Sequence, residues 1–314
     1  MSEPERSRRR YAVVGAGALG GLYGAMLARA GHAVQFLLRS DYEASRQRPW
    51  KVESHWGDFS IDRIDAVDSA DKLLPADVTI LSTKTVHNDS ADGLLKKVTA
   101  GGGRVMVLQN GLDIEGPAIR TVGRSRVLSG VCFLCSNKVG PCHIRHLDQG
   151  RVMFGRLDGP CDATVEGIAE DFREAGIPTK TTDDVAAMRW RKLMWNIPFN
   201  GLSVAVDAST RELIDDPHSR SLAESLIDEV HAAAAACGVM IPEKQKTQTI
   251  QATLDMVPYD SSMRVDFRER RPLEIEAIFE NPIRAAAEHG LAMSRTGTLA
   301  KQLRFLDRRN RQNG

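Results

Sequence analysis

The 314-residue sequence has no long hydrophobic run, no large excess of charge of one sign and no regular cysteine pattern. No apolar stretch approaches the roughly 20 residues that a membrane-spanning helix needs, so we expect no membrane partner. The net charge of +1 lacks the basic excess typical of general nucleic-acid binders, so we expect no nucleic-acid partner. Five irregularly spaced cysteines are typical of a reduced, cytoplasmic protein.

Two of the cysteines have a spacing that could indicate a zinc or redox site. Cys132 and Cys135 belong to an apolar stretch for which we predict a strand. Positions i and i+3 of a strand point to opposite faces, so the two sulfurs would not converge on one metal ion. No helix begins directly after Cys132 to lower the pKa of its thiol. We therefore expect no metal site.

A glycine-rich turn near the start organises the rest of the chain. A short apolar strand at Tyr11–Val14 leads into it, and a predicted helix leaves it and ends before Gly31. The turn itself is Gly15-Ala16-Gly17-Ala18-Leu19-Gly20. In this G-x-G-x-x-G pattern the first glycine permits a tight turn, the second lets a pyrophosphate approach the backbone, and the third lets helix and strand pack closely. The six residues are predicted to bind a dinucleotide at a helix N-terminus; the alternative is a glycine turn without a ligand.

The order of predicted elements indicates an α/β fold. Strands predicted near residues 33–38, 76–82 and 104–108 alternate with helices, which is typical of a doubly wound parallel sheet. A small hairpin is predicted at 52–61, and short antiparallel segments with glycine turns at 127–154. From residue 184 onward nearly every segment has a helical pattern. We predict a Rossmann-type NADP-binding domain over residues 1–183 and an all-helical substrate and catalytic domain over 184–314.

Polar residues follow several of the predicted strands, where ligands of such sheets bind. Lys84 and Asn110 each stand just beyond the end of one strand. Arg39 stands after the second strand, where proteins that bind NAD carry Asp or Glu. A guanidinium would instead pair with a 2′-phosphate, so NADP(H) is predicted over NAD(H). Neutralisation by the nearby Asp41 would leave Arg39 as an ordinary loop residue.

The first helix of the second domain is predicted over residues 185–197. Lys192, Asn196 and Asn200 are four residues apart and share one helix face, which suits a small polyoxygenated substrate. A solvated polar stripe is the alternative. Pro198 removes a backbone donor and crowds the carbonyl of Met194, so we expect the helix to kink or end there.

These motifs together resemble one enzyme family. The glycine turn is followed, in matching order and spacing, by Lys84, Asn110-Gly111, Trp190-Arg191-Lys192-Leu193, Asn196, Asn200, Ser261-Ser262 and Glu274. From Tyr11 over almost its whole length, the sequence resembles the ketopantoate reductases (2-dehydropantoate 2-reductases). The resemblance implies NADPH-dependent reduction of 2-dehydropantoate to pantoate, a step of pantothenate biosynthesis.

The same resemblance implies roles for individual residues. Lys192 would be the catalytic acid, and Glu274 a catalytic carboxylate at the substrate and nicotinamide end. Besides the glycine turn and Arg39, the implied cofactor-binding residues are Lys84, Asn110, Ser136 and Glu274. The implied substrate-binding residues are Asn110, Lys192, Asn196, Asn200 and Ser262.

Two departures from the family pattern leave the exact 2-keto acid open. Tyr259-Asp260 stands where the family often has an Asn, and Thr210 where some members have another substrate-binding Asn. Another 2-keto acid, including opine-type chemistry, is one alternative. A non-catalytic NADPH sensor is another, although sensing would need neither Lys192 nor Glu274. The partner expected in every case is a small molecule, and a homodimer is compatible with the sequence.

Overall fold

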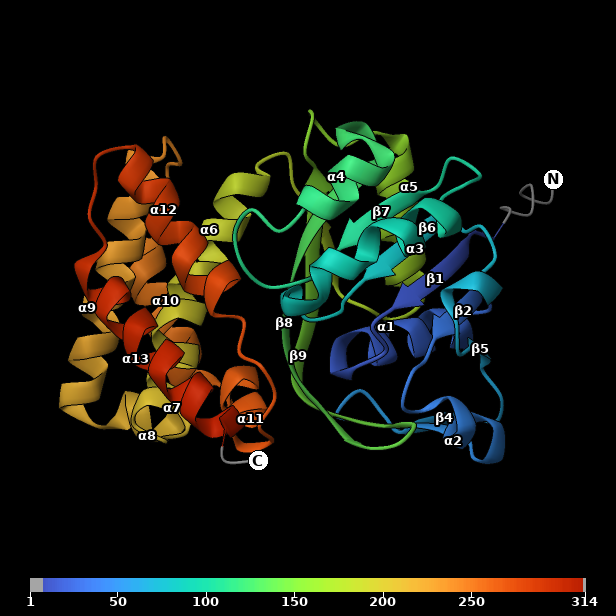
Figure 1. Cartoon of the computed structure of the whole chain (residues 1–314), viewed down its shortest axis with the longest axis horizontal. Helices are drawn as coiled ribbons and strands as arrows, with labels where there is room; N and C mark the ends of the chain where they lie inside the picture. Colours follow the sequence, from blue (N-terminus) through green and yellow to red (C-terminus); the bar gives the residue numbers. More distant parts are fainter. Residues whose placement is uncertain (1–7, 313–314) are drawn as a thin grey trace. The chain divides into compact units, whose positions relative to one another are not determined.

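The computed structural model describes residues 8–312, which belong to two compact units (Figure 1). The first, called here the sheet unit, comprises Met1–Gln109 and Glu115–Val185. The second, called the helical unit, comprises Asn110–Ile114 and Ala186–Gly314. A short segment from the first half of the sequence therefore belongs with the helices. Within residues 8–312, no helix is both long and apolar enough to cross a bilayer.

The sheet unit is built on one mixed sheet of ten strands. The strands lie side by side in the order β4-β3-β9-β8-β7-β6-β1-β2-β5, and β10 pairs with β9. Their bounds are β1 (Arg10–Val14), β2 (Ala33–Leu37), β3 (Trp50–Ser54), β4 (Phe59–Ile61), β5 (Asp65–Val67), β6 (Val78–Leu81), β7 (Arg104–Val107), β8 (Val127–Gly140), β9 (His143–Arg156) and β10 (Thr179–Thr181).

The predicted doubly wound core is confirmed. The neighbours β5, β2, β1, β6, β7 and β8 are all parallel. Val14 is in register with Leu37 on one side and Leu81 on the other, and Leu81 is in register with Val107. The carboxyl ends of four strands therefore meet at one edge of the sheet, where the residues that follow each strand gather.

The antiparallel extension differs from the prediction of short segments. β8 and β9 are 14 residues each and form one long hairpin. Two of its glycines mark close contacts: a Cβ on Gly155 would lie 1.9 Å from the carbonyl oxygen of Thr182, and one on Gly130 would lie 2.6 Å from Leu108. The hairpin of β3 and β4 was predicted and is confirmed.

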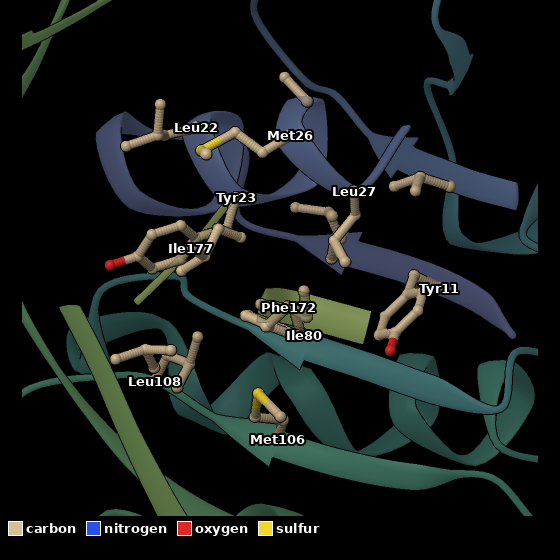
Figure 2. Packing of buried hydrophobic residues seen from close by; sticks show 14 of the residues in the cluster. Tyr11, Leu22, Tyr23, Met26, Leu27, Ile80, Met106, Leu108, Phe172 and Ile177 are labelled. Carbon is tan, nitrogen blue, oxygen red and sulfur yellow. The ribbon is translucent and has the colours of Figure 1, made fainter. Parts of the chain in front are cut away.

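Helices cover the sheet and bury its apolar side chains. They are α1 (Ala18–Arg29), α2 (Tyr42–Gln47), α3 (Ala91–Val98), α4 (Gly116–Val122) and α5 (Ala163–Glu174). Figure 2 shows Tyr23 and Leu27 on the side of α1 that faces the strands. Leu22 of α1 and Phe172 of α5 belong to the same buried cluster. The segment between β6 and β7 begins as a 3-10 turn, Thr85–Ser90, and continues as α3.

A buried ion pair joins the first strand to α5. The hydroxyl of Tyr11 donates to Oδ2 of Asp171 at 2.6 Å, and Arg9 donates to the same oxygen at 2.7 Å. Asp171 is only 3% exposed. Burial, and the hydrogen bond to the carboxylate, raise the pKa of Tyr11 well above its ordinary value, so the phenol stays a donor.

The helical unit packs its helices around α9. Its elements are α6 (Val185–Trp195), the π-helical η4 (Asn196–Asn200), α7 (Gly201–Ala205), α8 (Thr210–Asp215), α9 (Pro217–Ala236), α10 (Lys244–Asp255), α11 (Ser262–Arg268), the π-helical η5 (Glu276–Glu280), α12 (Asn281–Glu288) and α13 (Ser294–Gln312). α9 contacts η4, α10, α12 and α13.

Two short helices of this unit, α8 and α11, have no counterpart among the predicted helices. They span six and seven residues, too few to display a hydrophobic period. Both begin at a capping serine, Ser209 and Ser261. Ser209 and Glu212 form a complete capping box, a local signal that could have located α8.

Two tyrosine variants compare a charged with a neutral buried hydrogen bond. Tyr11→Phe removes the bond to the Asp171 carboxylate, and Tyr23→Phe removes one to the carbonyl of Gly150 at 3.1 Å. We expect Tyr11→Phe to lower the free energy of unfolding by about 1.5–3 kcal/mol and Tyr23→Phe by about 0.5–1.5 kcal/mol. Urea unfolding of both variants measures this. An equal or larger loss for Tyr23→Phe would contradict it.

Candidate active site

The glycines of the turn differ in whether the fold itself requires them. Gly15 has φ +101°, and a Cβ there would lie 2.4 Å from the backbone nitrogen of Thr83. A Cβ on Gly20 would lie 2.4 Å from the carbonyl oxygen of Gly15. A Cβ on Gly17 would meet nothing within 4 Å. The protein itself therefore gives no steric reason for glycine at 17, while an approaching pyrophosphate would.

The first turn of α1 is also suited to an anion. Its N-cap is Gly17, which offers no side chain to the N–H groups of the first turn, and no acidic residue stands in that turn. The unsatisfied N–H groups and the positive end of the helix dipole favour a phosphate there. Ser82, at the end of β6, donates to the carbonyl of Gly15 at 2.9 Å and steadies the turn. Sequence reasoning missed Ser82, because no local pattern pairs it with Gly15.

At the end of β2, the structure decides whether Asp41 neutralises Arg39. Asp41 is buried, and its carboxylate accepts from the ammonium of Lys138 at 2.6 Å and from the backbone N–H of Cys142 at 2.9 Å. Arg39 is exposed. Across residues 8–312 the structure gives Arg39 no ion pair or hydrogen bond, so its guanidinium remains available beyond the strand end.

Three further polar residues lie along the sheet unit. Lys84 follows β6 at the same edge and is partly buried. Ser136 lies within β8, is 6% exposed, and its Oγ has no hydrogen-bond partner among the described residues. Gln109, which the sequence did not single out, donates to the carbonyl of Thr83 at 2.9 Å and to Asn88 at 2.7 Å. It ties the ends of β6 and β7 together.

Asn110 begins the short segment that belongs to the helical unit. The N–H of Leu112 donates to the carbonyl of Ala277 at 2.9 Å, and Asn281 donates to the carbonyl of Leu112 at 2.7 Å. Gly111 has φ +116°, and a Cβ there would lie 2.6 Å from Ala277. This anchoring places the side chain of Asn110 next to Asn196, whose Nδ2 lies 3.4 Å from Oδ1 of Asn110.

The helix that carries the polar stripe does not end at Pro198. It passes from α6 through the π-helical η4 into α7, so of the two outcomes expected at Pro198, a kink or an end, the end does not occur. The wider i→i+5 turn accommodates a ring that would clash in an α-helix. It also offsets part of the roughly 80° drift that eight α-helical residues accumulate, and so keeps Asn200 near the face of Lys192.

Asn200 is a buried residue of the stripe with a polar atom that lacks a partner among the described residues. It is 1% exposed, and its Oδ1 has no hydrogen-bond partner among the described residues. A buried acceptor left unpaired costs free energy, so the arrangement favours a ligand that donates a hydrogen bond to it. This distinguishes Asn200 from a solvated polar stripe.

Ser261 and Ser262 have different surroundings. Ser261 is fully buried and caps α11 by accepting from the N–H of Arg264, and it contacts the hydroxyl of Ser203 at 2.6 Å. Ser203 in turn donates to the carbonyl of Asn200 at 3.0 Å. The capping role therefore belongs to Ser261, and Ser262 opens α11 without one.

Glu274 stands just before the helical residues that begin at Ile275. It is 5% exposed, and its carbonyl accepts from the N–H of Ile278 at 3.2 Å. The N–H groups of the turn that follows are a favourable environment for its carboxylate.

The two departures from the family pattern have structural roles in this chain. Asp260 accepts hydrogen bonds from the guanidinium groups of Arg264 and Arg268. Arg264 also donates to the carboxylate of Asp207. The hydrogen bond from Arg264 lowers the pKa of Asp207. Thr210 donates to the carbonyl of Tyr259 at 2.8 Å. These contacts fix the loop before α11 and leave Thr210 no free hydroxyl proton.

Two models of one enzyme family match most of this chain. The family "Ketopantoate reductase PanE/ApbA" matches residues 11–159, and "Ketopantoate reductase PanE/ApbA C terminal" matches residues 184–307. The chain belongs to the ketopantoate reductase family. It is therefore an oxidoreductase that uses a nicotinamide cofactor and acts on a small molecule, as the resemblance implied.

Individual members of the family are similar to this chain over nearly its full length. A 2-dehydropantoate 2-reductase of Nostoc sp. is 42% identical over 97% of each chain. The crystal structure of 2-dehydropantoate 2-reductase from Geobacter metallireducens is 38% identical, with a TM-score of 0.91 over 94% of this chain and 99% of that one. A D-mandelate dehydrogenase structure with NADH and anilino(oxo)acetate is 19% identical, with a TM-score of 0.88 over 96% and 99%, and shares the fold.

Alanine at Gly17 tests whether this glycine serves the cofactor rather than the fold. Because a Cβ there meets no protein atom, Gly17→Ala should unfold within a few degrees of the wild type. It should weaken NADPH binding by at least about tenfold, roughly 1.4 kcal/mol, because the methyl group occupies the path of the pyrophosphate. Differential scanning fluorimetry and fluorescence titration measure the two effects.

Two other glycines provide the controls. Gly20→Ala should lower the melting temperature, since its Cβ would press on the backbone of Gly15. Gly93→Ala, in the exposed surface of α3 with open space around it, should leave NADPH affinity unchanged. Unaltered NADPH affinity in Gly17→Ala would show that the turn does not hold the pyrophosphate.

Proposed function

We propose that this protein reduces 2-dehydropantoate to pantoate with NADPH, a step of pantothenate biosynthesis. The observation that carries the proposal is the buried, unpartnered Oδ1 of Asn200 on the helix face that begins with Lys192, in a chain of this family. 2-Dehydropantoate offers a carboxylate, a keto group and a hydroxyl. Its hydroxyl is the donor that the Asn200 oxygen lacks, and its keto oxygen is the group that an acid must reach.

The proposed chemistry assigns one task to each side chain. The bound nicotinamide supplies a hydride to the keto carbon. Lys192 carries a proton on Nζ and passes it to the oxygen as negative charge develops there. Glu274 orients the Lys192 ammonium or a substrate hydroxyl. Asn196, paired with Asn110, and Ser262 complete the polar lining that orients the substrate.

The cofactor assignment within the nicotinamide class rests on the edge of the sheet. Gly15 to Gly20 and the first turn of α1 hold the pyrophosphate, and Lys84 and Ser136 supply further polar groups. Arg39 takes the place of an acidic residue and pairs with a 2′-phosphate. The engagement of Asp41 by Lys138 supports this, because the carboxylate is not available to neutralise Arg39.

Other functions remain as alternatives to be tested. The D-mandelate dehydrogenase likeness indicates that the fold by itself does not select the substrate. A panel of 2-keto acids, with and without amines for opine-type condensation, discriminates among reductases. Absence of turnover despite tight NADPH binding would favour the non-catalytic NADPH sensor.

The proposal of a cytoplasmic location rests on the cysteine content. A homodimer stays a prediction, which light scattering can measure.

Arg39→Ala tests the cofactor preference. We expect wild-type protein to bind NADPH more tightly than NADH, and the variant to lose about tenfold or more of its NADPH affinity with little change for NADH, because only NADPH presents the 2′-phosphate. Titration with both cofactors measures it. Arg46→Ala, an exposed arginine of the neighbouring α2, should change neither affinity. Equal wild-type affinities for the two cofactors would refute the assignment.

Lys192→Ala tests the general acid. The variant should lose about 10²–10⁴ in kcat, the usual contribution of a positioned acid, while NADPH affinity stays within a few-fold because the glycine turn belongs to the other unit. Glu274→Ala should also impair turnover, and the double variant should lose less than the two losses combined. Steady-state kinetics with NADPH and 2-dehydropantoate measure these effects.

The control for this series is Lys301→Ala, an exposed lysine of α13, which should keep wild-type kinetics. A near-normal kcat in Lys192→Ala would show that the acid is a different group and that the stripe is a solvated helix face.

A further inference from the structure

The indole ring of Trp195 lies beside the proposed acid. The ammonium nitrogen of Lys192 is 5.4 Å from the centroid of the Trp195 ring, within the range of a cation–π contact. The two residues are three apart on α6, so their side chains lie on neighbouring positions of one helix surface. Neither the sequence motifs nor the family resemblance singled out Trp195.

The ring is itself fixed from a second helix. Nε1 of Trp195 donates to Oγ1 of Thr253 at 3.2 Å, and the Thr253 hydroxyl donates to the carbonyl of Thr249 at 2.9 Å. Thr253 is 3% exposed, and its donation to Thr249 turns a lone pair toward the indole. The Trp195 ring also lies 5.4 Å from the ring of Phe199, with 31° between the ring planes. α10 thus sets the plane of the indole.

A lysine has four flexible methylene groups, and its ammonium visits many positions unless something restricts it. The Trp195 ring is held by its hydrogen bond to α10 and by packing on Phe199. Its face therefore offers the Lys192 ammonium one preferred position. Restricting the ammonium in this way raises the fraction of time it spends where a substrate oxygen can be protonated. The indole is suited to this because its face attracts a cation more strongly than the face of Phe or Tyr.

We propose that Trp195, held by Thr253 of α10, is a positioning residue that orients the ammonium of Lys192 for proton transfer. The inference rests on the proposed role of Lys192 as the acid. It predicts a loss in kcat rather than in cofactor binding, since Trp195 acts through Lys192. It also predicts that the indole N–H and the Thr253 hydroxyl act as a pair, because both maintain the plane of the same ring.

Four single variants separate the ring from its anchor. Trp195→Leu removes the aromatic face and should lower kcat about 3- to 30-fold, the range that a cation–π contact supplies. Trp195→Phe and Thr253→Val each keep a ring but remove the N–H to hydroxyl bond, and should show a smaller, matching loss of about 2- to 5-fold. Thr253→Ser keeps the hydroxyl and should restore kcat to within about twofold of the wild type.

The measurements are kcat and KM with 2-dehydropantoate, NADPH affinity and melting temperature for each variant. NADPH affinity should stay within about twofold throughout. A merely structural role would lower the melting temperature without a specific loss in kcat. A kcat for Trp195→Leu within twofold of the wild type, or equal losses for Thr253→Val and Thr253→Ser, would overturn the proposal.

A double variant distinguishes this proposal from the one it rests on. In the Lys192→Ala background, Trp195→Leu should cause no further loss in kcat, because the group that the ring positions is gone. If Lys192→Ala is impaired and Trp195→Leu still adds its full loss, only the positioning role is wrong. If Lys192→Ala itself keeps normal kcat, the acid assignment fails and the positioning role fails with it.

Discussion

The close approach of the β1–α1 turn to the end of β6 is the contact on which the cofactor edge depends. Gly15 lies against the backbone of Ser82 and Thr83, and Gly20 lies against Gly15, with no room for a Cβ at either glycine. The hydroxyl of Ser82 closes the contact. Because the parallel strands are in register, fixing this turn also fixes where Arg39 and Lys84 lie along the same edge.

In the helical unit, the corresponding constraint is that two π-helical segments of the backbone are packed in the interior. Both π-helical segments belong to this unit, and each is associated with a proline, Pro198 within η4 and Pro282 just after η5. The carbonyl of Ala277 in η5 accepts from Leu112 and so holds the segment that carries Asn110. Such π segments are frequent at functional sites, because they redirect side chains and carbonyls that a regular helix would keep in line.

The polar groups of this unit divide into two kinds. Thr210 and Asp260 are engaged with Tyr259, Arg264 and Arg268, and they stabilise the loop before α11. Asn200 has a buried acceptor that the described residues leave without a partner. Because Thr210 and Asp260 have hydrogen-bond partners of their own, the chain can depart from the family pattern there without leaving these polar groups unpaired. The second kind is where a substrate contributes the missing hydrogen bond.

Features that depend on local physics could be predicted from the sequence. The glycine spacing between a strand and a helix predicted the dinucleotide turn, because each glycine answers a steric demand of its immediate neighbours. The alternation of strands and helices predicted the parallel sheet, and the change to helical patterns predicted the second half of the chain. The resemblance then led to the family that the comparisons established.

Contacts between residues far apart in the chain set several other features, which local patterns do not reveal. Asp41 does not neutralise Arg39, because Lys138, 97 positions away, takes its carboxylate. The helix continues past Pro198, because a π turn packed against α9 accommodates the ring. The plane of Trp195 is set by Thr253, 58 positions away. Local patterns record what a residue prefers, whereas these contacts depend on which distant groups remain to be satisfied once the chain has folded.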